Sequence, residues 1–216
     1  MNRTGIVRTA AVTGVAAAAL SLAAAVPALA APGPVTTAAD LDGDGEPETV
    51  TAQQTGDDQL ISATVHGTYT SIHLPADSQF GVEAPRVTDL NGDGRAELVV
   101  TQSVGANTTF FSALHFDGRN LSPVVGPDGQ PFSFAEGGGV AAHLGYGCTP
   151  FEGGRAVVVV ASENDDVSRP AEQFTYSGTR TVYTLRDGAL SVQESTPVTA
   201  RPATDPLLAV DEAGCS

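Results

Sequence analysis

Basic residues are scarce in this chain, and lysine is absent. Ten arginines stand against 25 aspartates and glutamates, which gives a formal net charge of −15 at pH 7. Proteins that bind nucleic acid neutralise phosphate groups with clustered lysine and arginine side chains. Because so acidic a chain has no such cluster, we expect no nucleic-acid partner.

Long apolar runs are also rare, and the one of interest lies at the N-terminus. Arg3 and Arg8 precede an alanine-rich apolar stretch, residues 10–26, which is followed by the small-residue motif Ala28-Leu29-Ala30. These features are typical of a secretory signal peptide. We therefore expect residues 1–30 to be removed and the mature protein to be secreted, extracellular or associated with the cell wall, with no membrane segment. An uncleaved anchor is the alternative, although the stretch is short for a membrane span.

Cysteine is limited to Cys148 and Cys215. An even count in an exported protein favours a disulfide, which would tie the C-terminus to the fold. Two free buried thiols are the alternative. The chain has no nucleophile elbow, phosphate-binding loop or zinc signature, so we expect no enzymatic activity. A catalytic carboxylate pair stays open as an alternative, because the fold and not the sequence spacing assembles such pairs.

Acidic residues are concentrated in two loops with the same nine-residue pattern. Residues 40–48 read Asp-Leu-Asp-Gly-Asp-Gly-Glu-Pro-Glu, and residues 89–97 read Asp-Leu-Asn-Gly-Asp-Gly-Arg-Ala-Glu. In each loop, acidic or amide side chains occupy alternate positions, and a glycine (Gly45 or Gly94) permits the sharp bend that turns them inward. Carboxylates at this density repel one another, so a folded loop needs a cation to offset the repulsion.

Calcium is the cation that this pattern favours, because it takes roughly six to eight oxygen ligands in a flexible shell. The closing glutamate is at the ninth position and leads into a strand, unlike an EF-hand, in which it is at the twelfth position and leads into a helix. A metal-free turn is the alternative. The predicted ligands are Asp40, Asp42, Asp44, Glu46 and Glu48 in the first loop and Asp89, Asn91, Asp93, Arg95 and Glu97 in the second, with Glu46 and Arg95 binding through backbone carbonyls.

Short strand patterns recur along the rest of the chain and helical periodicity is weak, which predicts an all-β fold. Similar patterns follow each loop, so we divide a single domain, residues 31–216, into units at about residues 38–87, 88–143 and 144–200 and a C-terminal tail. In the third unit, Cys148 lies where a third loop would begin, but the acidic ligands are missing. The predicted disulfide would then replace the missing ion. Units this small must pack against one another to bury their apolar faces.

These residues resemble the FG-GAP or VCBS repeats of integrin-α-like β-propellers. The resemblance rests on Phe80-Gly81, Ala84-Pro85, the second acidic loop and Leu98-Val99-Val100, in that order, and it extends over about residues 38–200. It implies a β-propeller-like fold of about three blade-like units, whose acidic loops bind calcium. Known propellers have about four to eight blades. Three units therefore imply either a small open or compact β domain or an oligomer that completes a ring.

The function that these features favour is a secreted, non-catalytic binding or adhesion module with structural calcium loops. Its expected partner is a glycan, a cell-wall component or another protein. A lectin-like carbohydrate-binding protein and, with less support, a secreted hydrolase are the alternatives. The four histidines, His66, His73, His115 and His143, lie in or beside strands without ligand spacing. We expect them to be ordinary surface or core residues.

Overall fold

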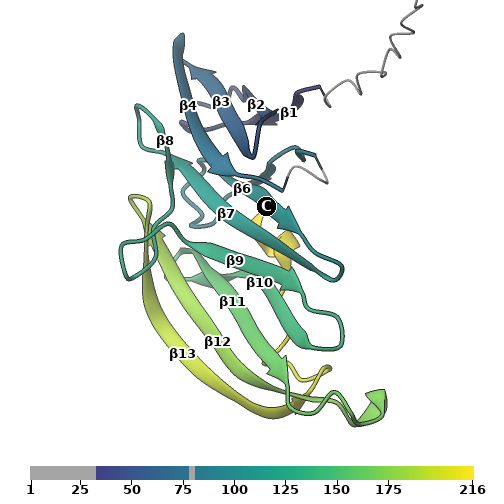
Figure 1. Cartoon of the computed structure of the whole chain (residues 1–216). Coiled ribbons are helices and arrows are strands. Elements are labelled where there is room, and N and C mark those ends of the chain that lie inside the picture. Colours follow the sequence, from purple (N-terminus) through teal and green to yellow (C-terminus); the bar gives the residue numbers. More distant parts are fainter. Residues whose placement is uncertain (1–32, 78–80) are drawn as a thin grey trace, which may run out of the picture. The chain divides into compact units, whose positions relative to one another are not determined.

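The computed structural model describes residues 33–77 and 81–216, so the expected signal peptide and Phe80 of the repeat motif lie outside the described residues. The chain from Ala31 to Ser216 groups as one compact unit. Its described residues form thirteen β-strands and two short 3₁₀ helices, which confirms the all-β prediction (Figure 1). Neither of these helices is long and apolar enough to cross a membrane.

The first four strands form an antiparallel sheet of their own. Each strand pairs with the next along the chain, so the sheet is a simple meander, the usual arrangement of a propeller blade. In β3, alternate residues such as Ile61, Ala63 and Val65 are buried, because one face of the sheet is packed. The strands are β1 (Val35–Ala39), β2 (Glu48–Thr55), β3 (Asp58–Val65) and β4 (Thr68–Pro75).

The other nine strands form one open sheet. Their order is β13-β12-β11-β10-β9-β7-β6-β5, and β8 pairs with β7 outside this path. All the pairs between these strands are antiparallel. The strands are β5 (Arg86–Thr88), β6 (Glu97–Val104), β7 (Thr108–Phe116), β8 (Leu121–Pro123), β9 (Ser133–Gly137), β10 (Ala142–Phe151), β11 (Gly154–Asn164), β12 (Thr175–Arg186) and β13 (Ala189–Pro202).

Two further four-stranded meanders, β5–β8 and β10–β13, lie within this large sheet, and β9 joins them. The edge of β7 is shared, because β8 pairs only with Leu114–Phe116 and β9 pairs with Thr108–Ser112. β9 then pairs with β10 through Gly137 and Leu144. The three sequence units therefore do not make three separate sheets. The short β8 leaves most of the β7 edge available, and β9 uses that edge to link the second and third units.

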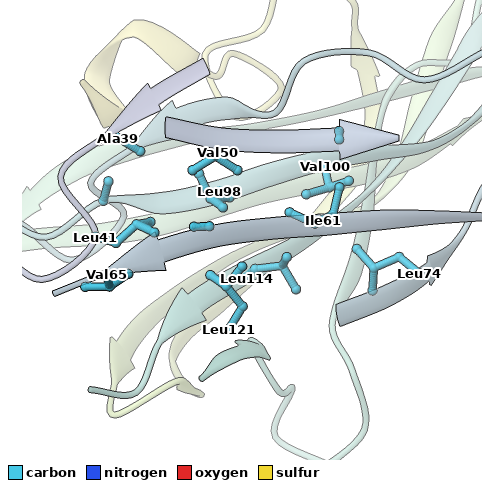
Figure 2. Packing of buried hydrophobic residues seen from close by; sticks show 13 residues of the cluster. Ala39, Leu41, Val50, Ile61, Val65, Leu74, Leu98, Val100, Leu114 and Leu121 are labelled. Atoms are coloured by element: carbon cyan, nitrogen blue, oxygen red, sulfur yellow. The ribbon is translucent and has the colours of Figure 1, made fainter. Parts of the chain in front are cut away.

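An apolar core joins the first sheet to β6 and β7. Figure 2 shows Val50 and Ile61 of the first sheet packed with Leu98, Val100 and Leu114 of the second. All five side chains are fully buried. Burying side chains of this size contributes about 1.5–3 kcal/mol each, so this core is a main source of stability for the first two units.

The strand β6 is covered on both faces. Leu98 and Val100 belong to the core shared with the first sheet, whereas Val99 belongs to a second cluster with Phe111 and Tyr146. Its first four residues, Glu97–Val100, are consequently all buried. A continuous buried run is expected when neither face of a strand meets solvent. Because β6 begins directly after the second acidic loop, that loop is attached to the best-buried strand of the sheet.

The predicted disulfide is present and holds the C-terminal tail against β10. It joins Cys148, within β10, to Cys215, the last residue of the short helix η2 (Glu212–Cys215). The third loop expected to begin at Cys148 is therefore not there, because β10 and β11 are joined by the tight turn Glu152-Gly153. The tail instead reaches the second acidic loop, where the backbone N–H of Asp89 donates to the carbonyl of Cys215 at 2.7 Å.

We expect the disulfide to stabilise the fold by about 2–4 kcal/mol, because it closes a long loop in the unfolded chain. Its two cysteines are 67 positions apart. Reduction should lower the thermal unfolding midpoint, measured by circular dichroism with and without dithiothreitol. A Cys148→Ser, Cys215→Ser double variant should unfold at one lower temperature in both conditions. Equal midpoints for oxidised and reduced wild-type protein would contradict this prediction.

Candidate metal centre

Both acidic loops connect two antiparallel strands. The first loop joins β1 to β2, and the second joins β5 to β6. In the first pair, Ala39 lies opposite Glu48, and in the second pair, Thr88 lies opposite Glu97. This register places each closing glutamate at the base of its loop, beside the point where the chain enters it.

The first aspartate of the first loop bends the chain around its own carboxylate. Asp40 Oδ1 accepts hydrogen bonds from the backbone N–H groups of Gly43 and Asp44, at 2.8 and 3.1 Å. Its Oδ2 accepts a third hydrogen bond, from the N–H of Gly45, at 2.9 Å. Gly45 has φ of 88°, a conformation that glycine adopts without strain.

The second loop repeats this arrangement position by position. Asp89 Oδ1 accepts hydrogen bonds from the N–H groups of Gly92 and Asp93, at 2.6 and 3.2 Å. Its Oδ2 accepts from the N–H of Gly94, at 3.2 Å, and Gly94 has φ of 85°. The two loops share six of their nine residues, and in both the first aspartate holds the bend through the same three hydrogen bonds.

The later side chains of both loops also match. In each loop the third side chain accepts a hydrogen bond from the backbone N–H of the fifth residue, and the fifth side chain accepts one from the N–H of the seventh. The ninth side chain accepts one from the N–H of the second residue. The donor and acceptor pairs are Asp44 to Asp42, Glu46 to Asp44 and Leu41 to Glu48 in the first loop, and Asp93 to Asn91, Arg95 to Asp93 and Leu90 to Glu97 in the second. Each of these side chains therefore has one oxygen turned toward the inside of the loop.

The first loop brings its carboxylates close enough to share a cation. One oxygen each of Asp40, Asp42 and Glu48 lies within 4.8 Å of the other two, and Asp42 and Asp44 form a second such group with His66. The Asp42 side chain is only 10% exposed. Its Oδ2 atom is buried and has no hydrogen-bond partner. A buried carboxylate oxygen without a donor is costly, so these residues fit an oxygen-binding cation such as calcium.

In the second loop, the charged form of the closing glutamate is disfavoured by burial and by neighbouring carboxylates. Glu97 is 4% exposed. Burial, together with the charges of Asp93 and Asp89, raises its pKa to about 8, although the hydrogen bond from Leu90 N–H opposes this rise. A cation beside Glu97 would favour the charged form. The donor set of this loop is three carboxylates and the Asn91 amide, which also fits calcium.

An arginine from the third unit contacts the second loop. Arg155 Nη1 lies 3.6 Å from Asp89 Oδ2 and donates to the Asp89 carbonyl at 2.9 Å. The Arg155 backbone N–H donates to the carbonyl of Asn91 at 2.9 Å. The two acidic loops also touch, because the N–H of Ala96 donates to the Asp40 carbonyl at 2.7 Å. All three sequence units therefore meet around the acidic loops.

A cavity of about 160 Å³ lies beside the second loop. Asn91, Asp93 and Glu97 line it from the loop, and Asp117 and Asp187 line it from two hairpin turns. These turns join β7 to β8 and β12 to β13, and each has an Asp-Gly sequence.

His66 is the side chain near the first loop that sequence reasoning missed. It occupies the turn between β3 and β4, with φ of 48°, and was expected to be an ordinary surface or core residue. Its Nε2 atom lies 2.7 Å from Asp42 Oδ2. Nothing in the spacing of residues 42 and 66 indicates this proximity, because it depends on how β2, β3 and β4 pair.

An ionic network outside the loops is centred on Arg86. Arg86 Nη2 lies 2.6 Å from Glu136 Oε1, and Arg86 Nη1 lies 2.8 Å from Glu212 Oε2. The guanidinium also lies over the Phe111 ring, 4.5 Å from its centroid. The hydrogen bonds that Arg86 donates to Glu136 lower the pKa of the Glu136 carboxyl. The network links β5, β9 and the C-terminal tail, because each carboxylate comes from a different one of these segments.

One comparison with known proteins gives a match. Residues 33–100 match a family model described as an FG-GAP-like repeat. The matched segment extends from β1 into β6 and includes both acidic loops. No curated protein and no solved structure matches the chain. The resemblance inferred from the sequence motifs is confirmed for residues 33–100, the part of its expected range of about 38–200 that the FG-GAP-like repeat model matches.

Proposed function

We propose that this protein is a secreted, calcium-stabilised FG-GAP repeat protein that serves as a non-catalytic binding or adhesion module. The FG-GAP-like repeat at residues 33–100 supports a repeat-containing binding module. The disulfide between Cys148 and Cys215 supports an oxidising, extracellular environment. The blade-like meander β1–β4, followed by the meanders β5–β8 and β10–β13, supports three propeller-like units.

The observation that carries the calcium proposal is the shared conformation of the two loops. Both turn their alternate side chains inward with the same hydrogen bonds, and Asp42 Oδ2 in the first loop is buried without a donor. Calcium would supply the positive charge that these oxygens lack. The residues that would hold it are Asp40, Asp42, Asp44 and Glu48 in the first loop and Asp89, Asn91, Asp93 and Glu97 in the second, with the carbonyls of Glu46 and Arg95.

The proposed ion is structural, because each loop leads directly into a core strand. Val50 of β2 is fully buried and lies two residues after Glu48. Leu98 of β6 is also fully buried and directly follows Glu97. A ligand that binds only the folded state stabilises it by about 2.7 kcal/mol at a hundredfold excess over its dissociation constant. Calcium in the two loops would therefore stabilise the strands that form the shared core.

The absence of catalysis is part of the proposal. Glu136 and Glu212 are one pair of carboxylates outside the loops, and both are engaged by Arg86, which serves as a shared ion-pair partner. An acidic surface without lysine argues for a glycan or protein partner and against nucleic acid. The strands β5 and β13 end the large sheet, so a second copy of the chain is a further candidate partner.

We expect calcium to raise the thermal unfolding midpoint of the oxidised protein by several degrees. The measurement compares unfolding in excess EDTA with unfolding in millimolar calcium. Asp44→Ala and Asp93→Ala should each reduce the rise, because each variant removes one inward-facing carboxylate. Glu172→Ala, an exposed position in the helix η1 (Ala171–Gln173), is the charge-matched control and should keep the full rise.

The same measurement would refute the calcium proposal in two ways. An equal midpoint in EDTA and in calcium would mean that the loops are metal-free turns. An undiminished calcium effect in both Asp44→Ala and Asp93→Ala would mean that calcium binds elsewhere.

Glu97→Gln should separate two effects on stability. One is the destabilisation caused by the buried Glu97 carboxyl in the metal-free loop, and the other is the stabilisation gained when calcium binds. The raised pKa leaves Glu97 mostly protonated at neutral pH in the metal-free loop. Glutamine keeps a side-chain oxygen for Leu90 N–H and is neutral without taking up a proton. In EDTA at neutral pH it should raise the free energy of unfolding by on the order of 3 kcal/mol, since holding a carboxyl of ordinary pKa 4.5 protonated at pH 7 costs about 1.4 kcal/mol for each unit of difference. It should also diminish stabilisation by calcium. Glu163→Gln, at an exposed position, is the control. Urea unfolding of both variants measures the difference in the free energy of unfolding. Destabilisation of Glu97→Gln in EDTA would contradict the assignment of Glu97 as a calcium ligand that destabilises the metal-free loop.

A further inference from the structure

The two acidic loops have equivalent neighbours of different chemistry. The hairpin β3–β4 follows the first loop, and the hairpin β7–β8 follows the second. The first residue of each turn is His66 in one case and Asp117 in the other. The structure places His66 with the ligand atoms of the first loop and Asp117 in the cavity beside the second. The turn residue beside the first loop therefore offers an imidazole nitrogen, whereas the turn residue beside the second loop offers only carboxylate oxygens.

The contact between His66 and Asp42 does not have the geometry of a hydrogen bond. His66 Nε2 lies 2.7 Å from Asp42 Oδ2, yet this oxygen has no hydrogen-bond partner. The ring N–H direction consequently does not point at the carboxylate. Two ligands of a tetrahedral zinc ion lie about 3.4 Å apart, so a cation shared by these two atoms would move them slightly apart. A ligand oxygen of Asp44 lies within 4.8 Å of both atoms.

Burial distinguishes this group from an ordinary surface cluster. The Asp42 side chain is nine-tenths buried, with 10% of its surface exposed, whereas His66 is 69% exposed. Asp42 Oδ1 is already used by the N–H of Asp44, at 3.1 Å. The unused Oδ2 atom is the one that faces His66. The site is thus open to solvent on the imidazole side, from which a cation can enter.

The equivalent residue of the second loop is committed to its own turn. Asp117 Oδ1 accepts hydrogen bonds from the N–H groups of Arg119 and Asn120, at 2.8 and 2.7 Å. Asn91, which replaces Asp42, donates from Nδ2 to Asp93 Oδ2 at 3.0 Å. The ligand side chains of the second loop and its turn residue Asp117 therefore offer only oxygens, and the nearby imidazole, His115 of β7, lines the adjoining cavity.

We propose that Asp42, Asp44 and His66 form a site for a divalent transition metal of the zinc class, distinct in preference from the all-oxygen second loop. Imidazole nitrogen suits zinc, whereas carboxylate and carbonyl oxygens suit calcium. Histidine nitrogen and carboxylate oxygen are both zinc ligands, and a zinc site with three protein ligands keeps its fourth position for water. This inference rests on the proposed function in one respect, because it uses two calcium ligands of the first loop.

His66→Asn is the variant that tests the inference. Asparagine tolerates the positive φ of this position and precedes Gly67, so it suits the turn while removing the imidazole. His73→Asn, at an exposed position of β4, is the matched control. Isothermal titration with zinc chloride measures affinity for wild-type protein and both variants. The imidazole ring resonances of His66, followed by NMR, report whether this side chain binds the metal.

We expect zinc affinity to fall about tenfold or more in His66→Asn, since losing even a supporting group of a metal ligand costs about 10–100-fold. His73→Asn should bind zinc as wild type does, and zinc should shift the His66 resonances. Thermal unfolding in calcium should show that His66→Asn keeps its calcium-dependent rise. Equal zinc affinity in wild type and His66→Asn, as a simple His66–Asp42 ion pair would give, overturns the inference.

The two proposals fail separately in these measurements. A calcium-dependent rise without His66-dependent zinc binding leaves the proposed function in place and removes the zinc site. His66-dependent zinc binding without any calcium effect supports the zinc site and refutes the calcium proposal. If neither metal binds, both proposals are wrong.

Discussion

The capture of backbone N–H groups by the first aspartate of each loop is the interaction on which the repeated unit depends. Asp40 and Asp89 each accept three such hydrogen bonds. They thereby bend the loops that connect β1 to β2 and β5 to β6. The loop thereby sets the register of the following strand. A register slip of one residue would turn Leu98 and Val100 away from the shared core, so loop geometry and core packing are coupled.

The same geometry concentrates negative charge where basic partners are few. Arg155 is close to the second loop, but Glu97 is buried and keeps a strongly raised pKa. In the first loop, the cost is a buried Asp42 oxygen without a hydrogen-bond donor. Both costs have the same physical origin, the desolvation of carboxylates, and a bound cation would relieve both. The loops differ in what surrounds them, and that difference separates their proposed metal preferences.

The third unit shows how tertiary pairing can override a sequence alignment. Residues 154–160 align with the strand that follows the second loop, which suggested a degenerate third loop at Cys148. The structure has a tight turn there, and its backbone packs on the second loop through Arg155 and Asn91. β9 was also unforeseen as a link, because its five residues pair with β7 only after the short β8 leaves that edge free.

By itself, the sequence determined the all-β class, the two acidic loops, the disulfide pairing and the FG-GAP-like region. Each of these depends on a local pattern or, for the disulfide, on there being only two cysteines. Only the tertiary structure decided that His66 lies beside Asp42, that the loops touch through Ala96, and that the second and third units share a sheet. The physical reason is range, because hydrogen bonds within nine residues specify a loop, whereas its neighbours depend on which strand edges and apolar faces meet.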